Sequence, residues 1–310
     1  MSDSPADATP YEVLGVLPTA DDESLRRAYR RAARERHPDL GGDPHAFRQL
    51  QDAWEQIGTP AARRAYDAGA TSRASSRVPA GGRADGAFVG FAPPSPRRDS
   101  RPRARSYGHP GGRSREIFLA ALREWVGLGD PIDDPYDPAL IRSAPPGVRR
   151  LIAEALAEES TAGLVADLGI AVTVWHDVDA GPDGKLDHIV LSPNGLWAIE
   201  SIDWGGRVRV EHGEIVGPTL APGERPVHAL VRASRAVQRV TRIRFTGRLL
   251  VVPDSAVDDD IQVVGHARKP TAFVVRRSAL RAVLNTPAAE PGTVDVFAIR
   301  DRLQQTVRFI

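Results

Sequence analysis

Two stretches of the sequence bring together residues whose types could do chemistry. The first is "ERHPDLGGD", residues 35–43, in which His37, Pro38 and Asp39 follow a run of arginines. A His beside an Asp is compatible with a metal site, or with a general base and its orienting carboxylate. The second is "KLDHIVLSPNGLWAIESI", in which Asp187 and Glu200 lie on consecutive apolar runs. Carboxylates on adjacent strands could hold a divalent cation through oxygen ligands, as phosphodiester hydrolysis requires.

The first stretch offers too few ligands for a metal site. His37 and Asp39 are two donors, His45 would be a third only with favourable folding, and the chain contains no cysteine. A general base would need a pocket, for which a small helical unit has little room. Pro38 cannot continue the preceding helix, and the following glycines supply flexible backbone. The residues alone therefore favour a turn that ends a helix.

The residues around this turn predict four helices between residues 9 and 67. Thr9 is the expected N-cap of the first, with Pro10 at its first helical position. The second runs over "DDESLRRAYRRAARERH", with acids at its start and bases at its end. The third runs over "DPHAFRQLQDAWEQIGT" with Asp43 as its cap, and "PAARRAYD" is a short fourth. Apolar residues recur every three or four positions, which predicts a small helical core.

Over residues 8–69, this pattern of helices and its central tripeptide resemble a J-domain, the co-chaperone module of the DnaJ type. All four helices occur in the family's order, and Trp54 stands where the family more often has Tyr. The resemblance implies that the tripeptide and the basic face of the second helix contact a DnaK-type chaperone and stimulate its ATP hydrolysis. The implied contact residues are His37, Pro38, Asp39, Arg26, Arg27, Arg30, Arg34 and Arg36. Such a module binds its partner and does no covalent chemistry itself.

Residues 70–114 are predicted to be a disordered linker. Between residues 68 and 114 there are nine Arg and two Asp, with much Gly, Pro and Ser and few large apolar residues. The arginines could neutralise nucleic-acid phosphates. However, only two of the chain's 41 basic residues are Lys, which indicates a G+C-rich genome. An electrostatic arm and a plain tether both remain open.

Residues 115–310 predict an α/β domain. "REIFLAALREWVGL" and "GVRRLIAEALAEESTAGLVADL" have helical periodicity, and "VTVWHDV", "LDHIVLS" and "GLWAIESI" are expected strands. The Asn-Gly pair between the last two predicts a hairpin. A helix over "RPVHALVRASRAVQRVTRI" precedes the strands "RLLVVP", "IQVVG" and "AFVVR" and a last helix near residues 293–305. Strands interrupted by helices predict an α/β sandwich.

From about Gly147 to Arg276 the chain resembles the nuclease-related domain, a branch of the PD-(D/E)xK nuclease-like fold. The resemblance implies a restriction-endonuclease-like mixed sheet. In that family an Asp is followed one strand later by Glu-x-Lys, and these residues form the metal and catalytic site. The matching positions here are Asp187 and Glu200, with Ile202 where the family has Lys. Ile can neither orient water nor stabilise negative charge, so the resemblance implies an inactive site.

Two further features bear on that site. Lys185 lies two residues before Asp187, hence on the same strand face, and is a candidate replacement for the family's Lys. His188 alternates to the opposite face and is predicted to pack rather than to bind a metal. The family also uses a Glu on the leading helix, for which the candidates are Glu154, Glu158 and Glu159.

These features together predict a cytoplasmic J-domain co-chaperone whose nuclease-like domain is inactive and binds a client protein or nucleic acid. The alternatives are a metal-dependent nuclease regulated through its J-domain, and an adaptor that binds protein alone. No cofactor is expected, except Mg²⁺ or Mn²⁺ under the nuclease alternative. A net charge of +1, no signal peptide and no apolar run of about 20 residues argue against a membrane partner.

Overall fold

The computed structural model describes residues 4–38, 42–75, 102–127, 131–285 and 295–310. They form two compact units. The helical unit comprises residues 7–38, 42–75, 127 and 131–146, and the α/β unit comprises residues 4–6, 102–126, 147–285 and 295–310. The predicted linker residues 76–101 lie outside the described residues. Within the described ranges, no helix is long and apolar enough to cross a membrane.

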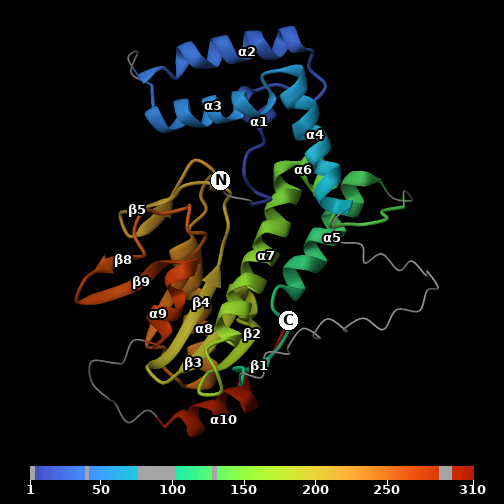
Figure 1. Cartoon of the computed structure of the whole chain (residues 1–310). Helices are drawn as coiled ribbons and strands as arrows, with labels where there is room; N and C mark the ends of the chain where they lie inside the picture. Colours follow the sequence, from blue (N-terminus) through green and yellow to red (C-terminus); the bar gives the residue numbers. More distant parts are fainter. Residues whose placement is uncertain (1–3, 39–41, 76–101, 128–130, 286–294) are drawn as a thin grey trace, which may run out of the picture. The chain divides into compact units, whose positions relative to one another are not determined.

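The helical unit has the four helices that the sequence predicts. They are α1 (Pro10–Leu14), α2 (Asp22–Glu35), α3 (Pro44–Ile57) and α4 (Pro60–Ser75). Figure 1 shows α2 and α3 lying alongside each other. The buried core is formed by Tyr11, Leu14, Leu25, Ala32, Leu50, Ala53 and Ile57. Trp54 packs against this core and stacks on Tyr29, with ring centroids 4.3 Å apart.

The helices begin where side chains satisfy their first backbone N–H groups. Thr9 caps α1 in a reciprocal pair with Glu12, and Asp21 and Asp43 cap α2 and α3. Gly15 ends α1 at a φ of 67°, a left-handed conformation that glycine adopts without a Cβ clash. Local capping therefore explains why the first three helices start close to the predicted residues.

The helical unit is nevertheless larger than the sequence predicts. α4 continues to Ser75, past the expected boundary at residue 69, and α6 (Pro138–Ser143) packs against it. The guanidinium of Arg142 lies over the Tyr66 ring, 5.9 Å from its centroid, in a cation–π contact. Residues 131–146, which the sequence analysis assigns to the C-terminal domain, group with the helical unit in the structure. Their Pro- and Asp-rich pattern has too little apolar periodicity to predict a packing partner.

The α/β unit is built on a mixed seven-stranded sheet with the order β1-β2-β3-β4-β7-β9-β8. Neighbouring strands are parallel in the pairs β1–β2, β4–β7 and β7–β9, and antiparallel in the pairs β2–β3, β3–β4 and β8–β9. The strands are β1 (Arg105–Tyr107), β2 (Thr173–Asp179), β3 (Lys185–Ser192), β4 (Gly195–Ser201), β7 (Gly247–Val252), β8 (Ile261–His266) and β9 (Lys269–Arg276). The predicted mixed sheet is confirmed.

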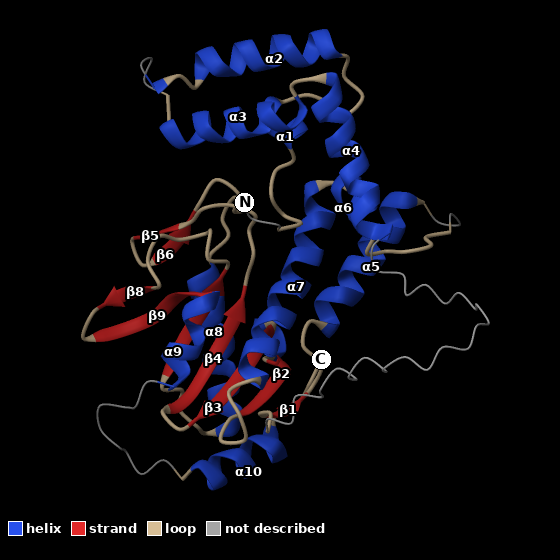
Figure 2. Ribbon diagram, viewed as in Figure 1, coloured by secondary structure: helices blue, strands red, loops and turns tan. Residues whose placement is uncertain are grey.

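Helices cover both faces of this sheet (Figure 2). One apolar cluster contains residues of α7 and α9, and the other contains residues of α8 and α10. Leu249 and Leu250 of β7 enter different clusters, which explains why this strand is an unbroken apolar run. The remaining elements are α5 (Gly112–Val126), α7 (Pro146–Ala166), η2 (Gly181–Asp183), β5 (Arg209–Glu211), β6 (Glu214–Val216), α8 (Pro226–Thr241), η3 (Arg277–Ala279), α9 (Leu280–Asn285) and α10 (Val296–Thr306).

Order in the α/β unit begins inside the predicted linker. β1 pairs in parallel with β2, with Arg105 opposite Thr173, and α5 starts at Gly112. The prediction of a linker up to residue 114 is therefore wrong for residues 102–114. A three-residue edge strand is stabilised mainly by pairing with its neighbour. It is too short to show the alternating apolar pattern from which strands are predicted.

Candidate functional site

The predicted tripeptide lies at the end of α2. α2 ends at Glu35, His37 and Pro38 follow it, and Asp39 lies outside the described residues. The Gly42 N–H donates to the His37 carbonyl at 3.0 Å, so the loop returns to the end of the helix. A Cβ at Gly42 would clash with the Arg36 backbone, which only glycine avoids. The expected helix-ending turn is confirmed.

The His37 side chain is held against α3. Its ring meets Phe47 edge to face, with centroids 5.1 Å apart, and it remains half-buried. Pro38 beside it is exposed. The loop therefore presents a positioned imidazole and a rigid proline at the surface of the helical unit.

The predicted basic face of α2 is mostly available to a partner. Arg26, Arg27, Arg30 and Arg34 are exposed. Arg27 makes a surface ion pair with Glu23 at 2.8 Å, an interaction that contributes little to stability. Arg36 differs, because it is half-buried and its Nη1 donates to the Val13 carbonyl at 3.4 Å. Arg36 therefore ties the end of α2 to α1, while the other four form the accessible face.

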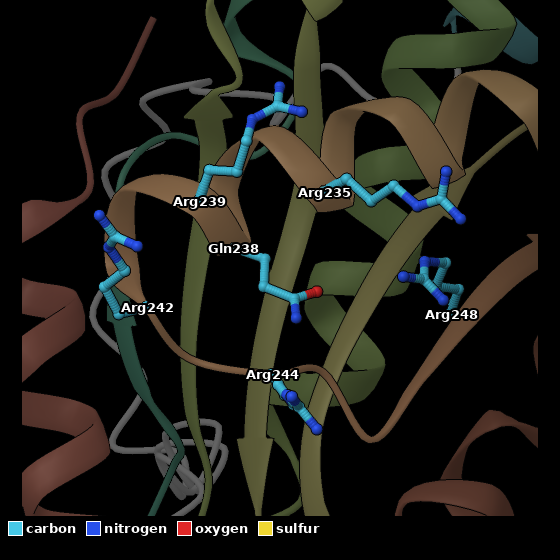
Figure 3. A pocket seen from close by; sticks show the side chains of 6 residues that line it. All are labelled: Arg235, Gln238, Arg239, Arg242, Arg244 and Arg248. Atoms are coloured by element: carbon cyan, nitrogen blue, oxygen red, sulfur yellow. The ribbon is translucent and has the colours of Figure 1, made fainter.

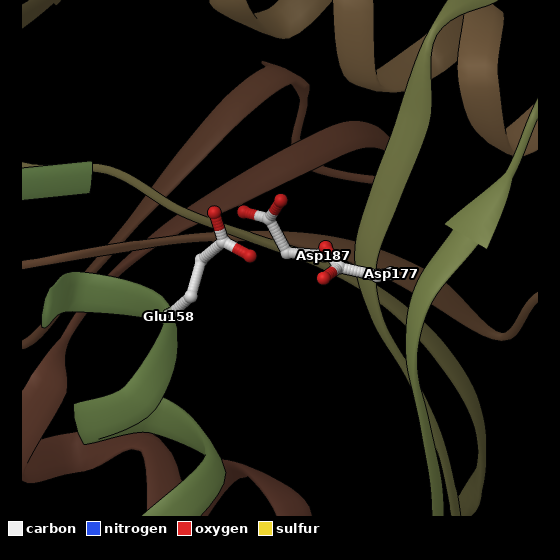
Figure 4. A group of neighbouring side chains, drawn as sticks. All are labelled: Glu158, Asp177 and Asp187. Carbon is white, nitrogen blue, oxygen red and sulfur yellow. The ribbon is translucent and has the colours of Figure 1, made fainter. Parts of the chain in front are cut away.

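In the α/β unit, Lys185 lies among three carboxylates. Its Nζ is 2.5 Å from Asp177 Oδ1, 2.6 Å from Glu158 Oε2 and 3.0 Å from Asp187 Oδ1. The three carboxylates have oxygens within 4.8 Å of one another, and Figure 4 shows them pointing toward a shared space. We call Lys185, Glu158, Asp177 and Asp187 the carboxylate cluster. The structure thus brings the candidate replacement Lys185 to Asp187, as the strand alternation predicts.

The hairpin of β3 and β4 sets this geometry. Ser192 pairs with Gly195, so a two-residue loop joins the strands, and the predicted hairpin is confirmed. Asp187 and Glu200 consequently lie together near its open end, where they hydrogen-bond each other. The Ser201 N–H also donates to Asp187 Oδ2 at 2.8 Å. The predicted convergence of Asp187 and Glu200 is therefore confirmed.

The structure selects one of the three candidate glutamates of α7. Glu158 is buried, contacts Lys185 and accepts a hydrogen bond from Ser114 Oγ at 2.5 Å. Glu154 pairs with Arg150 at 3.3 Å, and Glu159 pairs with Arg115 at 2.5 Å. Since Glu154 and Glu159 each face an arginine, Glu158 is the helix residue of the cluster.

Sequence reasoning missed Asp177. It is buried near the end of β2 with a φ of 48°, an uncommon conformation outside glycine that Asp tolerates better than most residues. Its Oδ1 contacts Lys185, and its Oδ2 accepts from the Arg113 N–H at 3.3 Å. The available signal was a polar His-Asp pair interrupting an apolar strand in "VTVWHDV".

Burial and mutual repulsion shift the titration of this cluster. Burial, followed by the charge of Asp187, raises the pKa of Glu158 to about 8. The same two causes raise the pKa of Glu200 well above its usual value. Burial alone would lower the pKa of Lys185, but the carboxylates around it outweigh that effect and raise it. Lys185 is therefore an ammonium at neutral pH, and part of the carboxylate charge is neutralised by protons.

The position that carries Lys in the nuclease family is apolar here. Ile202 packs against the hydrophobic cluster that contains residues of α8. His188 is fully buried, and its Nδ1 lies 2.8 Å from the Nδ1 of His176. Burial lowers the pKa of His176 to about 4 and holds that of His188 well below its usual value, so both rings are neutral. The prediction that His188 packs is confirmed.

Comparisons with known proteins agree with both resemblances. Residues 9–67 match the family model of the DnaJ domain, and residues 153–252 match that of the nuclease-related domain. The first region is 51% identical over 57 residues to chaperone protein dnaJ A6 of Oryza sativa, covering 18% of this chain and 14% of that protein. It is 48% identical over 60 residues to chaperone protein DnaJ of Thermosynechococcus vestitus, covering 18% and 16%. The chain thus matches about one seventh of the length of these relatives.

Proposed function

We propose that this chain, which carries an N-terminal J-domain and a nuclease-related domain, is a co-chaperone that stimulates the ATPase of a DnaK-type chaperone in the cytoplasm. The observation that supports this proposal is the positioned loop at His37 and Pro38 beside the exposed arginines of α2. The arginines steer encounter with an acidic partner surface. The loop then favours the hydrolysing state of the partner by binding it better than the other states.

The proposal is tested by measuring single-turnover ATP hydrolysis of a purified DnaK-type chaperone at increasing concentrations of the full chain. A saturable increase in the hydrolysis rate is expected. An unchanged rate at concentrations that give measurable binding would contradict the proposal.

Neutralising the arginine face should weaken the encounter more than the final stimulation. In Arg30→Gln/Arg34→Gln we expect an association rate about tenfold lower at low salt and a weaker dependence on ionic strength, because the steering charge is lost. Stopped-flow binding and the concentration of half-maximal stimulation measure these effects. Arg48→Gln/Arg64→Gln removes the same charge from exposed positions on α3 and α4 and serves as the control. Equal losses in both variants would rule out a specific role for the α2 face.

For the nuclease-related domain, the proposed role is to bind the client, a protein or a nucleic acid, that is delivered to the chaperone. Ile202 replaces the family's Lys, and the Lys185 ammonium already neutralises part of the carboxylate charge. This proposal expects no cleavage of DNA or RNA with Mg²⁺ or Mn²⁺.

A second candidate function is a metal-dependent phosphodiesterase, which the placement of Lys185 favours. Three buried carboxylates with converging oxygens fit a hard divalent cation, which would activate water and polarise a phosphate when bound. Glu158, Asp177 and Asp187 would hold the ion. The Lys185 ammonium, charged at neutral pH, would stabilise negative charge that develops on the phosphate. Cleavage that is lost in Asp187→Asn would support this candidate over an inactive domain.

If the cluster holds Mn²⁺, the affinity should increase with pH. Glu158 has a pKa of about 8 and must lose its proton to become a ligand, so the affinity should fall about tenfold for each pH unit below that value. Calorimetric titration at pH 6, 7 and 8.5 in two buffers measures both the affinity and the protons released. Glu158→Gln should bind weakly without this pH dependence. Glu159→Gln, next to it but paired with Arg115, should behave like the wild type.

A further inference from the structure

A strongly basic pocket lies at the end of α8. It has a volume of about 550 Å³ and is lined by Arg235, Gln238, Arg239, Arg242, Arg244 and Arg248. Figure 3 shows Arg235, Gln238 and Arg239 on α8, with Arg244 on the segment that leads into β7 and Arg248 at the start of β7 itself. The pocket shares no residue with the carboxylate cluster.

The positive charge of this pocket is largely uncompensated. Among the ion pairs of the described residues, its arginines make one, between Arg239 and Asp183 at 3.4 Å. Asp183 also binds Arg232 more closely, at 2.5 Å. Arg248 is half-buried beside Ser234, and burial together with the charge of Arg235 lowers its pKa. The cations therefore repel one another, and an anion in the pocket would relieve that repulsion.

The arrangement of the arginines fits an extended anion. Arg235 and Arg239 are four positions apart on α8, so they share one face about 6 Å apart along the helix axis, and Arg242 follows as the C-cap residue of the helix. Each guanidinium can bind a phosphate through two parallel hydrogen bonds. A regular row of forked donors suits a chain of repeating phosphates better than a single carboxylate.

The lining also excludes other ligand classes. All six residues are polar, with no aromatic ring on which a base could stack, so the pocket offers charge-assisted hydrogen bonds to phosphates rather than an aromatic stacking platform. Protein interfaces usually have an apolar centre, which this lining lacks. Contacts made to phosphates alone position a nucleic acid without selecting its sequence.

We propose that this pocket binds the phosphodiester backbone of a nucleic acid, independently of base sequence. Binding of a nucleic-acid backbone would be the specific form of the binding role proposed above for the nuclease-related domain, and it rests on that proposed role. It requires neither ATPase stimulation nor cleavage.

Fluorescence anisotropy of the full chain with 20-nucleotide single-stranded DNA and RNA, in EDTA between 50 and 200 mM salt, tests the proposal. In Arg235→Gln/Arg244→Gln, two exposed positions, we expect about tenfold weaker binding at 50 mM salt. The slope of log K against log salt should become shallower by about 1.4, because two phosphate contacts to a single strand are lost. The ratio of DNA to RNA binding shows which sugar is preferred.

Arg209→Gln/Arg281→Gln is the matched control, because it removes the same charge from exposed positions elsewhere in the α/β unit. Any contribution of the arginine-rich residues 76–101 is the same in all three proteins. An unchanged slope in the pocket variant, or an equal change in the control, would overturn the proposal. Tighter binding of poly-glutamate than of either nucleic acid would overturn it in favour of an acidic protein partner. The pocket variant should stimulate the DnaK-type ATPase like the wild type, which separates this inference from the co-chaperone role.

Discussion

His37→Gln is expected to reduce stimulation of a DnaK-type ATPase to the unstimulated rate. The His37 ring is held edge to face against Phe47 at the end of α2, so the imidazole is presented in one orientation. Gln keeps a polar side chain but cannot reproduce the shape of the ring. The cost to folding should be small, on the order of 1 kcal/mol, because the substitution removes one aromatic contact from a half-buried position. Single-turnover hydrolysis measures the loss.

The matched control for this prediction is His45→Gln, the same substitution at the start of α3 in the same unit. It should stimulate like the wild type, and circular dichroism should show equal helicity for both variants. Full stimulation by His37→Gln would refute the co-chaperone role. Equal loss in both variants would assign the effect to folding rather than to contact with the partner.

The helical unit was predictable because its signals are local. Side-chain caps at Thr9, Asp21 and Asp43 and the apolar stripes of α2 and α3 lie within a few residues of the structure they specify. The contact of α6 with α4 was not predictable for the opposite reason. Arg142 and Tyr66 are far apart in sequence, and neither belongs to a periodic apolar pattern. Domain boundaries that depend on such contacts require the structure.

The carboxylate cluster was predictable in part. Strand alternation placed Lys185 beside Asp187, and the hairpin placed Asp187 beside Glu200, because both follow from the period of a strand. The choice of Glu158 depended on Arg150 and Arg115 pairing with its neighbours, and these pairs follow from tertiary packing. Asp177 reaches the cluster because its backbone adopts an unusual conformation with a positive φ, which the alternating pattern of a strand does not predict.

Because Lys185 is the cation that three carboxylates share, Lys185→Met should destabilise the α/β unit by about 3–5 kcal/mol at neutral pH. The side chains of Asp177 and Glu158 are each 2% exposed and that of Asp187 is 5% exposed, so water cannot replace the ammonium. Removing one partner of a buried ion pair leaves an uncompensated charge. Urea unfolding followed by tryptophan fluorescence measures the loss. In a Trp54→Phe background, the remaining four tryptophans lie in the α/β unit.

The sign of the pH dependence identifies the cause. In the wild type the pKa of Lys185 is raised, so its stabilisation is fully present below its unfolded value of 10.5. In the variant, the pKa of Glu158 should rise beyond its present value of about 8. A carboxyl whose folded pKa exceeds its unfolded value loses stability as pH rises between the two values. The deficit of Lys185→Met should therefore grow as the pH rises above about 8, where Glu158 ionises in the wild type but is still protonated in the variant.

Two controls distinguish lost charge from lost packing. Lys269→Met, at the chain's only other lysine, is exposed and should change stability by less than about 0.5 kcal/mol. Lys185→Arg keeps the charge and should recover part of the stability. If the cluster binds Mn²⁺, saturating ion should also restore Lys185→Met, by about 2.7 kcal/mol at a hundredfold excess over Kd. A deficit that is independent of pH would mean that the lysine stem, and not its ammonium, stabilises the cluster. In that case the carboxyl groups would be protonated and neutral when the lysine is absent, and the cluster would not require a cation for its stability.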